Sequence, residues 1–286
     1  MLKSTFCHIP GISISTEQRL WSSGIHSWEA LSRTDRPQVS RRAAASLMLH
    51  IGKSFESLEK SDPNYFAELL PSNQHWRLFP DFRHSMAYLD IETTGLAYED
   101  AITTIALYDG QTIRCYVRGQ NLDDFRRDIR EYAVIVTYNG KCFDVPFIEG
   151  HFGMRMNQAH IDLRYVLRRL GYTGGLKGCE RKLGLDRKDL TDVDGYFAVL
   201  LWKDFIKNKS TRSLETLLAY NIQDVVNLET LLVMAYNVNL EETPFRDRFK
   251  LNLPAPPKLP YEADLRTINR IKRENPWMGG GFTRWR

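Results

Sequence analysis

The stretch from residue 87 to residue 96, AYLDIETTGL, has the composition of a buried strand and yet carries two acids. Side chains alternate between the faces of a strand, so Asp90 and Glu92 share one face and the apolar residues beside them share the other. A carboxylate removed from water costs several kcal/mol unless a partner compensates. A turn from Thr93 to Gly95 then places both acids at the end of the strand. Two interpretations stay open: a solvated strand face, or a site that uses paired acids.

Two later segments carry further acids at the ends of predicted elements. In VTYNGKCFDVPFI, residues 136–148, a buried strand ends at Asn139 and Asp144 opens the next helix, where a helix N-cap is the simpler explanation for an aspartate. In YNIQD, residues 220–224, Tyr220 and Asp224 are four apart and share one face of a helix, which is often just the solvated face. Neither segment decides the question by itself.

The conjunction of the three segments favours a metal site. Four acids brought together would repel one another by several kcal/mol unless cations neutralise them. Ligand sets made only of oxygen select Mg²⁺ or Mn²⁺, not zinc. Two such ions suit phosphoryl chemistry, because one lowers the pKa of an attacking water and the other stabilises the leaving oxygen about 4 Å away.

The three segments resemble the three motifs of the DEDD superfamily of ribonuclease H-like 3′-5′ exonucleases. YLDIETTGL resembles the first motif, TYNGKCFDVPFI the second and YNIQD the third. The superfamily has one branch with tyrosine four residues before the last acid and another with histidine five before it. Tyr220 and Ala219 match the tyrosine branch. With GGLKGCERKLGLDR, residues 174–187, the chain is similar to the bacterial and archaeal YprB-like group, over about residues 83–236.

This resemblance implies a fold, a cofactor and a set of site residues. The fold is α/β: a ribonuclease H-like mixed sheet flanked by helices, with a small helical region before it. Two Mg²⁺ or Mn²⁺ ions would be held by four acids, and Tyr220 would orient or deprotonate the attacking water. Asn139 would position the strand or the end of the substrate, and Thr93 is a further substrate-binding candidate. The implied metal ligands are Asp90, Glu92, Asp144 and Asp224.

Beside this pattern, Asp162 in HIDLRYVL is interpreted mainly as a helix N-cap or an outer-shell residue, with direct contact to metal as the alternative.

A basic segment between the second and third motifs offers contacts to phosphate. Lys177 is the first candidate and Arg181 the second, although a solvated helix face explains any one of these residues equally well. Together they would line a groove for a nucleic-acid backbone, where affinity falls with salt. The segment's basic residues are Arg168, Arg169, Lys177, Arg181, Lys182, Arg187 and Lys188.

Three regions of the chain differ in composition and hydrophobic pattern. Residues 1–75 predict helices that resemble half of a helix-hairpin-helix motif, but Gly11-Ile12-Ser13 departs from its Gly-x-Gly turn, so packing is favoured over DNA binding. Residues 83–237 predict the ribonuclease H-like domain. Residues 238–286 predict a proline-rich arm and a basic tail. In that tail Trp277, Phe282 and Trp285 alternate with arginines, which suits stacking on bases, packing into a groove or disorder equally.

Several element boundaries are predicted in the first two regions. Ser15 is expected to cap a helix, with Gly24 at the position that follows its end. Asp109-Gly110 is a strong hairpin signal. Helices are expected over residues 41–59, 122–131 and 214–236, and strands over residues 86–92, 101–108, 111–117 and 132–138.

The composition restricts the class of protein. The chain has 286 residues, of which 43% are hydrophobic and 12% aromatic, so it is expected to be globular. Its longest apolar run, residues 196–202, is too short to cross a membrane, and no signal peptide is recognisable, so a soluble cytoplasmic protein is expected. Four scattered cysteines indicate neither disulfides nor zinc.

The function that follows is a metal-dependent 3′-5′ exonuclease releasing nucleoside 5′-monophosphates from single-stranded DNA or RNA, with DNA slightly favoured. A structure-specific endonuclease and a non-catalytic nucleic-acid-binding module are the alternatives. The sequence identifies no protein partner.

Overall fold

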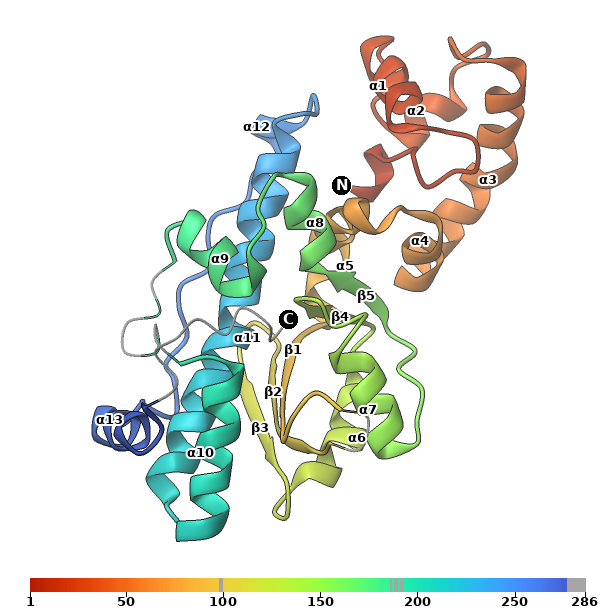
Figure 1. The fold of residues 1–286 in the computed structure, drawn as a ribbon. Helices are drawn as coiled ribbons and strands as arrows, with labels where there is room; N and C mark the ends of the chain where they lie inside the picture. Colours follow the sequence, from red (N-terminus) through yellow and green to blue (C-terminus); the bar gives the residue numbers. More distant parts are fainter. Residues whose placement is uncertain (98–99, 186, 188–189, 191–192, 277–286) are drawn as a thin grey trace.

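A computed structural model describes residues 1–276 apart from positions 98–99, 186, 188–189 and 191–192. Its centre is a five-stranded sheet with the strand order β3-β2-β1-β4-β5 (Figure 1). β1 pairs antiparallel with β2 and parallel with β4, and β4 pairs parallel with β5. This mixed sheet confirms the predicted fold class. The strands are β1 (Met86–Thr93), β2 (Ile102–Tyr108), β3 (Ile113–Val117), β4 (Val134–Thr137) and β5 (Ala159–Asp162).

The hairpin between β2 and β3 forms at Asp109-Gly110 as predicted. Gly110 has a φ of +91°, which a residue with a side chain rarely adopts. Asp109 Oδ1 accepts hydrogen bonds from the N–H groups of Gln111 and Thr112, at 2.9 and 2.7 Å. The turn therefore fixes the register of the antiparallel half of the sheet.

Helices cover both faces of the sheet. The long helix α11 (Thr211–Leu240) packs on β1 and β2, with α10 (Gly195–Asn208) beside it. The other face is covered by α6 (Phe125–Asp128) and α7 (Asp144–Phe152), whose apolar side chains join Leu89 and Ile91 in a second cluster. Because side chains alternate along β1, Asp90 and Glu92 face α11.

The remaining helices lie around this core and before it. In the N-terminal region they are η1 (Leu2–Ser4), α1 (Ile14–Ser22), α2 (Trp28–Ser32), α3 (Arg41–Glu59), α4 (Pro63–Leu69), η2 (Ser72–Leu78), α5 (Phe79–Phe82) and η3 (Arg83–Ser85). The later ones are η4 (Leu122–Asp124), η5 (Ile129–Glu131), α8 (Leu163–Arg169), α9 (Gly175–Lys182), α12 (Arg246–Phe249) and α13 (Leu265–Glu274).

Three local predictions differ from the structure. The cap of α1 is Ser13, not Ser15, because Ser13 has extended backbone angles and its Oγ accepts the N–H of Thr16, whereas Ser15 already lies inside the helix. The helix expected over residues 122–131 is broken into η4, α6 and η5. The helix expected over residues 214–236 begins earlier, at Thr211, because Ser210 caps it, and it continues to Leu240.

The C-terminal region contains both irregular chain and helix. Residues 250–264 form no helix or strand, but α13 follows them, and its Ile268 and Ile271 are buried. Trp277, Phe282 and Trp285 lie outside the described residues.

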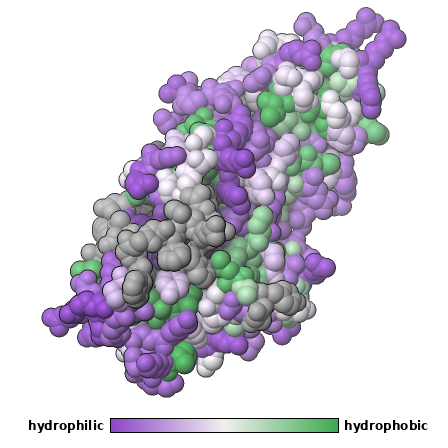
Figure 2. Space-filling model, viewed as in Figure 1, coloured by the Kyte–Doolittle hydropathy of each residue, from purple (hydrophilic) through white to green (hydrophobic). Residues whose placement is uncertain are grey.

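The surface in Figure 2 is largely hydrophilic, with apolar residues in small separate groups. Over the described residues, no helix has the length and apolar character that crossing a membrane requires.

Candidate metal centre

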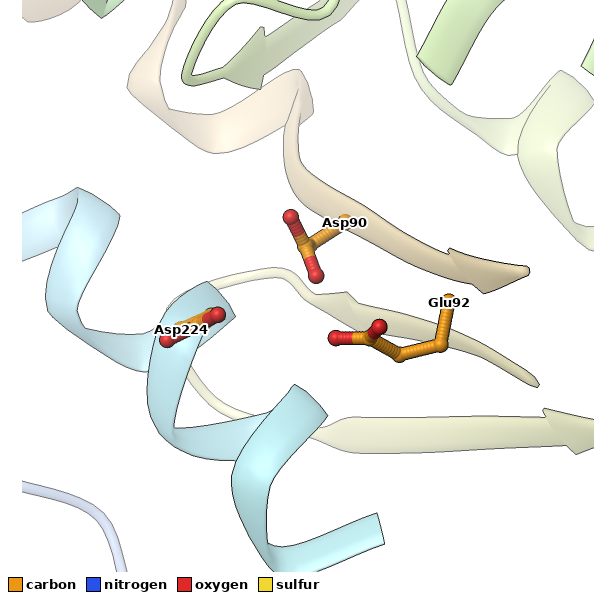
Figure 3. A group of neighbouring side chains, drawn as sticks. All are labelled: Asp90, Glu92 and Asp224. Carbon is orange, nitrogen blue, oxygen red and sulfur yellow. The ribbon is translucent and has the colours of Figure 1, made fainter. Parts of the chain in front are cut away.

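Three carboxylates converge where β1 passes α11. Asp90 and Glu92 come from the strand and Asp224 from the helix, and one oxygen atom of each lies within 4.8 Å of the others (Figure 3). Glu92 and Asp224 are buried, while Asp90 is partly exposed. All three line a pocket of about 230 Å³. The alternation of β1 and the packing of α11 on it together produce this cluster.

The fourth predicted acid, Asp144, lines the same pocket but lies outside the three-acid group. Its Oδ1 accepts the N–H of Ile91 at 3.1 Å, so it is anchored between the two acids of β1. Asp144 is the first residue of α7, and the N-cap position belongs to Phe143, which makes no side-chain cap. The simpler explanation of Asp144 as a helix cap is therefore wrong.

Burial and mutual repulsion disfavour the ionised form of these acids. The pKa values of Asp90 and Glu92 are raised well above their ordinary range, first by burial and then by neighbouring carboxylates. Burial likewise raises the pKa of Asp144 to about 7. A divalent cation would stabilise the ionised form of these carboxylates, which burial and repulsion disfavour. Because all the ligand atoms are oxygens, the set fits Mg²⁺ or Mn²⁺.

Asn221 is a residue of this site that the sequence analysis missed. Its Nδ2 donates to Asp90 Oδ2 at 2.7 Å, and its Oδ1 accepts from the hydroxyl of Thr104 at 3.1 Å. The second bond fixes which way the amide points. Its position directly after Tyr220 in the third motif was the available signal.

Tyr220 lies one helical turn before Asp224 and lines the pocket. Its ring has two cations near it: Lys177 Nζ lies 5.2 Å from the ring centroid, and the guanidinium carbon of Arg187 lies 5.9 Å from it. Burial, with Asp224 and Glu92 adding to it, raises the pKa of Tyr220 well above its ordinary value. Without bound metal the phenol therefore keeps its proton and is able to donate a hydrogen bond.

Arg187 is the second residue that the sequence analysis did not single out. It is buried and forms ion pairs with Glu180 and with Asp224. Burial alone would lower the pKa of its guanidinium, but the two carboxylates raise it above the ordinary value. Asn227 Nδ2 in turn donates to Glu180 Oε1 at 2.7 Å. The basic segment was recognised, but its sequence did not show which of its cations faces inward.

The predicted substrate-binding residues separate into two groups. Asn139, with the left-handed φ of 67°, and Thr93 both line the pocket, and Lys177 lies beside Tyr220. Arg181 lies on the exposed side of α9, outside the pocket lining. A phosphate contact from Arg181 therefore has no support in the geometry.

Asp162 caps α8, as its main interpretation predicts. Its carboxylate accepts the N–H groups of Asn139, Lys141 and Arg164 at 2.7 to 3.1 Å. These bonds hold the turn after β4 against the end of β5, which places Asn139 at the pocket.

Comparison with known proteins agrees with this geometry. Residues 87–236 match the family model of the RNase H superfamily, and this match covers more than half of the chain. The chain belongs to the RNase H superfamily. The match to the RNase H superfamily includes most of β1 and of α11, all four acids and Tyr220, whereas the N-terminal region and α13 lie outside it.

Two further proteins are similar to parts of this RNase H-superfamily chain. The uncharacterized protein YprB of Bacillus subtilis is 26% identical over 179 residues, which are 53% of this chain and 42% of that protein. The chain thus spans less than half the length of this relative. A family B DNA polymerase from the hyperthermophilic archaeon Pyrobaculum calidifontis has 16% identity and a TM-score of 0.41, over 55% of this chain and 24% of the polymerase.

Proposed function

We propose that this chain is a divalent-metal-dependent 3′-5′ exonuclease that acts on single-stranded nucleic acid, with DNA slightly preferred to RNA. The observation that supports it best is the meeting of Asp90, Glu92 and Asp224, with Asp144 and Tyr220 lining the same pocket, in an RNase H-superfamily domain. A surface that only binds nucleic acid gains nothing from carboxylates that face phosphates.

The reaction is the hydrolysis of the terminal phosphodiester. A water oxygen bonds to phosphorus, the bond from phosphorus to the 3′ oxygen breaks, and the products are a nucleoside 5′-monophosphate and a chain with a new 3′ hydroxyl. Asp90, Glu92, Asp144 and Asp224 would hold two Mg²⁺ or Mn²⁺ ions, which would lower the pKa of the attacking water and stabilise charge on the leaving oxygen.

The chain's own residues orient the reactants. The Tyr220 hydroxyl, still protonated, directs the attacking water by a hydrogen bond. Asn221 holds the Asp90 carboxylate in one orientation. Asn139 and Thr93, which line the pocket, contact the terminal nucleotide, and Lys177 adds positive charge near the phosphate.

The test follows 5′-labelled single-stranded DNA, duplex DNA and RNA with and without Mn²⁺, with products resolved by length. We expect labelled products that shorten from the 3′ end only when Mn²⁺ or Mg²⁺ is present. Asp90→Ala should lower the rate at least about 100-fold, because a lost metal ligand costs several kcal/mol of transition-state stabilisation. Asp123→Ala, an exposed aspartate in η4, is the matched control and should leave the rate unchanged.

Each alternative has a distinct outcome. Internal fragments from a circular substrate would show an endonuclease. Intact substrates with every metal, together with equal nucleic-acid binding with and without metal, would show a binding module. Full activity of Asp90→Ala would contradict the proposed metal site.

A further inference from the structure

A cationic strip lies beside the candidate metal centre, on a part of the molecule that the proposed chemistry does not use. Arg164 and Tyr165 both neighbour Arg168 on α8, because residues three and four apart are adjacent on a helix; the two arginines are exposed and Tyr165 is half-buried. Lys141, in the turn before α7, lies against this face. We call Lys141, Arg164, Tyr165 and Arg168 the α8 strip.

The cations of the α8 strip form no close ion pair with any carboxylate of the described residues. Among the described residues, no carboxylate lies within ion-pairing distance of Lys141, Arg164 or Arg168. Arg164 donates to the side-chain oxygen of Asn139, and Lys141 Nζ lies 3.3 Å from the hydroxyl of Ser72. Three neighbouring cations without an ion pair create a positive patch that attracts an anionic ligand.

The next arginine along α8 does have an acidic partner, which distinguishes it from the arginines of the strip. Arg169, the next residue along α8, pairs with Glu242. The nearby carboxylate of Asp162 already accepts three backbone N–H groups and is buried. Arg164 and Arg168 are exposed to solvent, whereas Lys141 is half-buried and Asp162 offsets part of its charge.

The strip is continuous with the metal centre at one end. Arg164 touches Asn139, and Asn139 lines the pocket that holds the acids. At the other end, Tyr165 and Arg168 line a cleft of about 520 Å³ with Pro71, Ser72 and Asn73. Figure 1 shows α8 at the end of the sheet nearer the N-terminal region, so the strip leads from the pocket toward that region.

The dimensions and chemistry of the strip fit a nucleic-acid strand. Arg164 and Arg168 are one helical turn apart, a rise of about 6 Å. A stacked strand advances about 3.4 Å per nucleotide, so the two arginines can meet phosphates one or two nucleotides apart. Lys141 Nζ lies 5.8 Å from the centroid of the half-buried Tyr165 ring, which steadies that ring at the edge of the cleft.

We propose that the α8 strip binds the nucleic-acid strand on the 5′ side of the scissile bond, with Arg164 and Arg168 on phosphates and Tyr165 stacked on a base. This inference rests on the proposed exonuclease function. Sequence-independent contacts of this kind, cations on phosphates and an aromatic ring on a base, are typical of proteins that hold single strands.

The test measures the anisotropy of a 5′-fluorescein oligothymidylate of about 12 nucleotides with the full chain in EDTA, which prevents hydrolysis. We expect Arg168→Glu to weaken binding about tenfold and to lower the slope of log affinity against log salt by about 1. Tyr165→Ala should weaken binding at least about fivefold. Arg126→Glu, an exposed arginine of α6 with the same change of charge, should weaken it less than about twofold.

The length of the oligonucleotide provides a further test of the α8 strip. The Arg168→Glu effect should shrink for an oligonucleotide of about two nucleotides, which cannot reach the strip. If Arg168→Glu binds like Arg126→Glu at every length, the inference is wrong. If Tyr165→Ala binds like the wild type, the strip holds polyanions in general and its assignment to nucleic acid is wrong.

The two proposals fail in different ways. Release of p-nitrophenol from the p-nitrophenyl ester of thymidine 5′-monophosphate, measured on the wild type with Mn²⁺, reports the metal centre and needs no contact with α8. If the wild type hydrolyses this ester but Arg168→Glu binds DNA normally, the inference about the α8 strip is wrong and the proposed exonuclease function stands. If binding depends on Arg168 but no substrate is hydrolysed, the proposed exonuclease function is wrong and the α8 strip is a nucleic-acid-binding surface.

Discussion

At the candidate metal centre, two cations of the chain itself balance part of the charge of the acids. Lys177 and Arg187 both lie near the ring of Tyr220, and Arg187 also pairs with Asp224. These cations offset repulsion among carboxylates that are buried before any metal ion arrives. The acid cluster can therefore stay assembled without a bound cation.

Arg187 is the residue whose loss should most destabilise this arrangement. Its removal leaves Glu180 buried without its cation, and breaking a buried pair in this way is strongly destabilising. We expect Arg187→Met to lower the free energy of unfolding of the metal-free protein by about 3 to 5 kcal/mol, measured by urea denaturation in EDTA. Arg127→Met, which removes surface ion pairs, is the control and should cost less than about 1 kcal/mol. Equal losses would contradict a buried role for Arg187.

At the scale of elements, the turn between β4 and α7 determines where Asn139 and Asp144 lie. Gly140 N–H donates to the hydroxyl of Thr137 at 3.0 Å, and a methyl group on Gly140 would overlap the Thr137 side chain. Thr137 cannot easily yield, because its hydroxyl is also bonded to His160 at 2.8 Å. The turn therefore has room for glycine alone.

We expect Gly140→Ala to displace this turn and, with it, two residues of the pocket. Overpacking of a buried contact costs about 1 to 3 kcal/mol, which thermal denaturation would measure. Nuclease activity should fall at least about tenfold, since small displacements of positioning groups are costly. Gly150→Ala in α7 is the control, because a methyl group there meets nothing within 4 Å, and it should stabilise the helix slightly. A Gly140→Ala protein as active and stable as the control would refute the steric argument.

Much of the sheet and of the acid cluster could be predicted because their signals are local. The period of two along β1 placed Asp90 and Glu92 on one face, and the Asp109-Gly110 pair marked the hairpin. Contacts set by tertiary packing left no such signal. The ion pair between Arg187 and Asp224 depends on the path of the chain after α9, and the bond from Ile91 to Asp144 depends on how β1 passes α7.

The capping residue of a helix is also difficult to predict from sequence when two candidates lie close together. Ser13 and Ser15 both precede the apolar pattern of α1, and only the backbone angles distinguish the true cap. Tyr165 was not singled out because an aromatic residue on a helix usually packs inward, and its partial exposure appears only once α8 is placed against η2.

At the scale of the whole molecule, the N-terminal helices share a core with the RNase H-like domain. One hydrophobic cluster contains Phe6 and Trp28, residues of α11 such as Leu231, and Ile268 of α13. A buried ion pair between Glu17 and Arg77 lies within the N-terminal part of this core. The boundary predicted near residue 75 stays a prediction, but such continuous packing favours unfolding as one unit.

The Glu17 and Arg77 pair offers a test of this coupling. Glu17 Oε1 also accepts the N–H groups of Phe6 and Cys7. The carboxylate therefore connects the segment after η1 to Arg77 of η2. We expect Glu17→Gln to cost about 3 to 5 kcal/mol, because Arg77 would stay buried without its counter-charge. Glu29→Gln, which weakens an exposed pair with Lys3, should cost less than about 1 kcal/mol.

Urea transitions followed by tryptophan fluorescence and by far-UV circular dichroism should coincide in both variants, because the indoles of the N-terminal region and of α10 share the core. Two separated transitions in Glu17→Gln would show instead that the N-terminal helices unfold independently of the sheet.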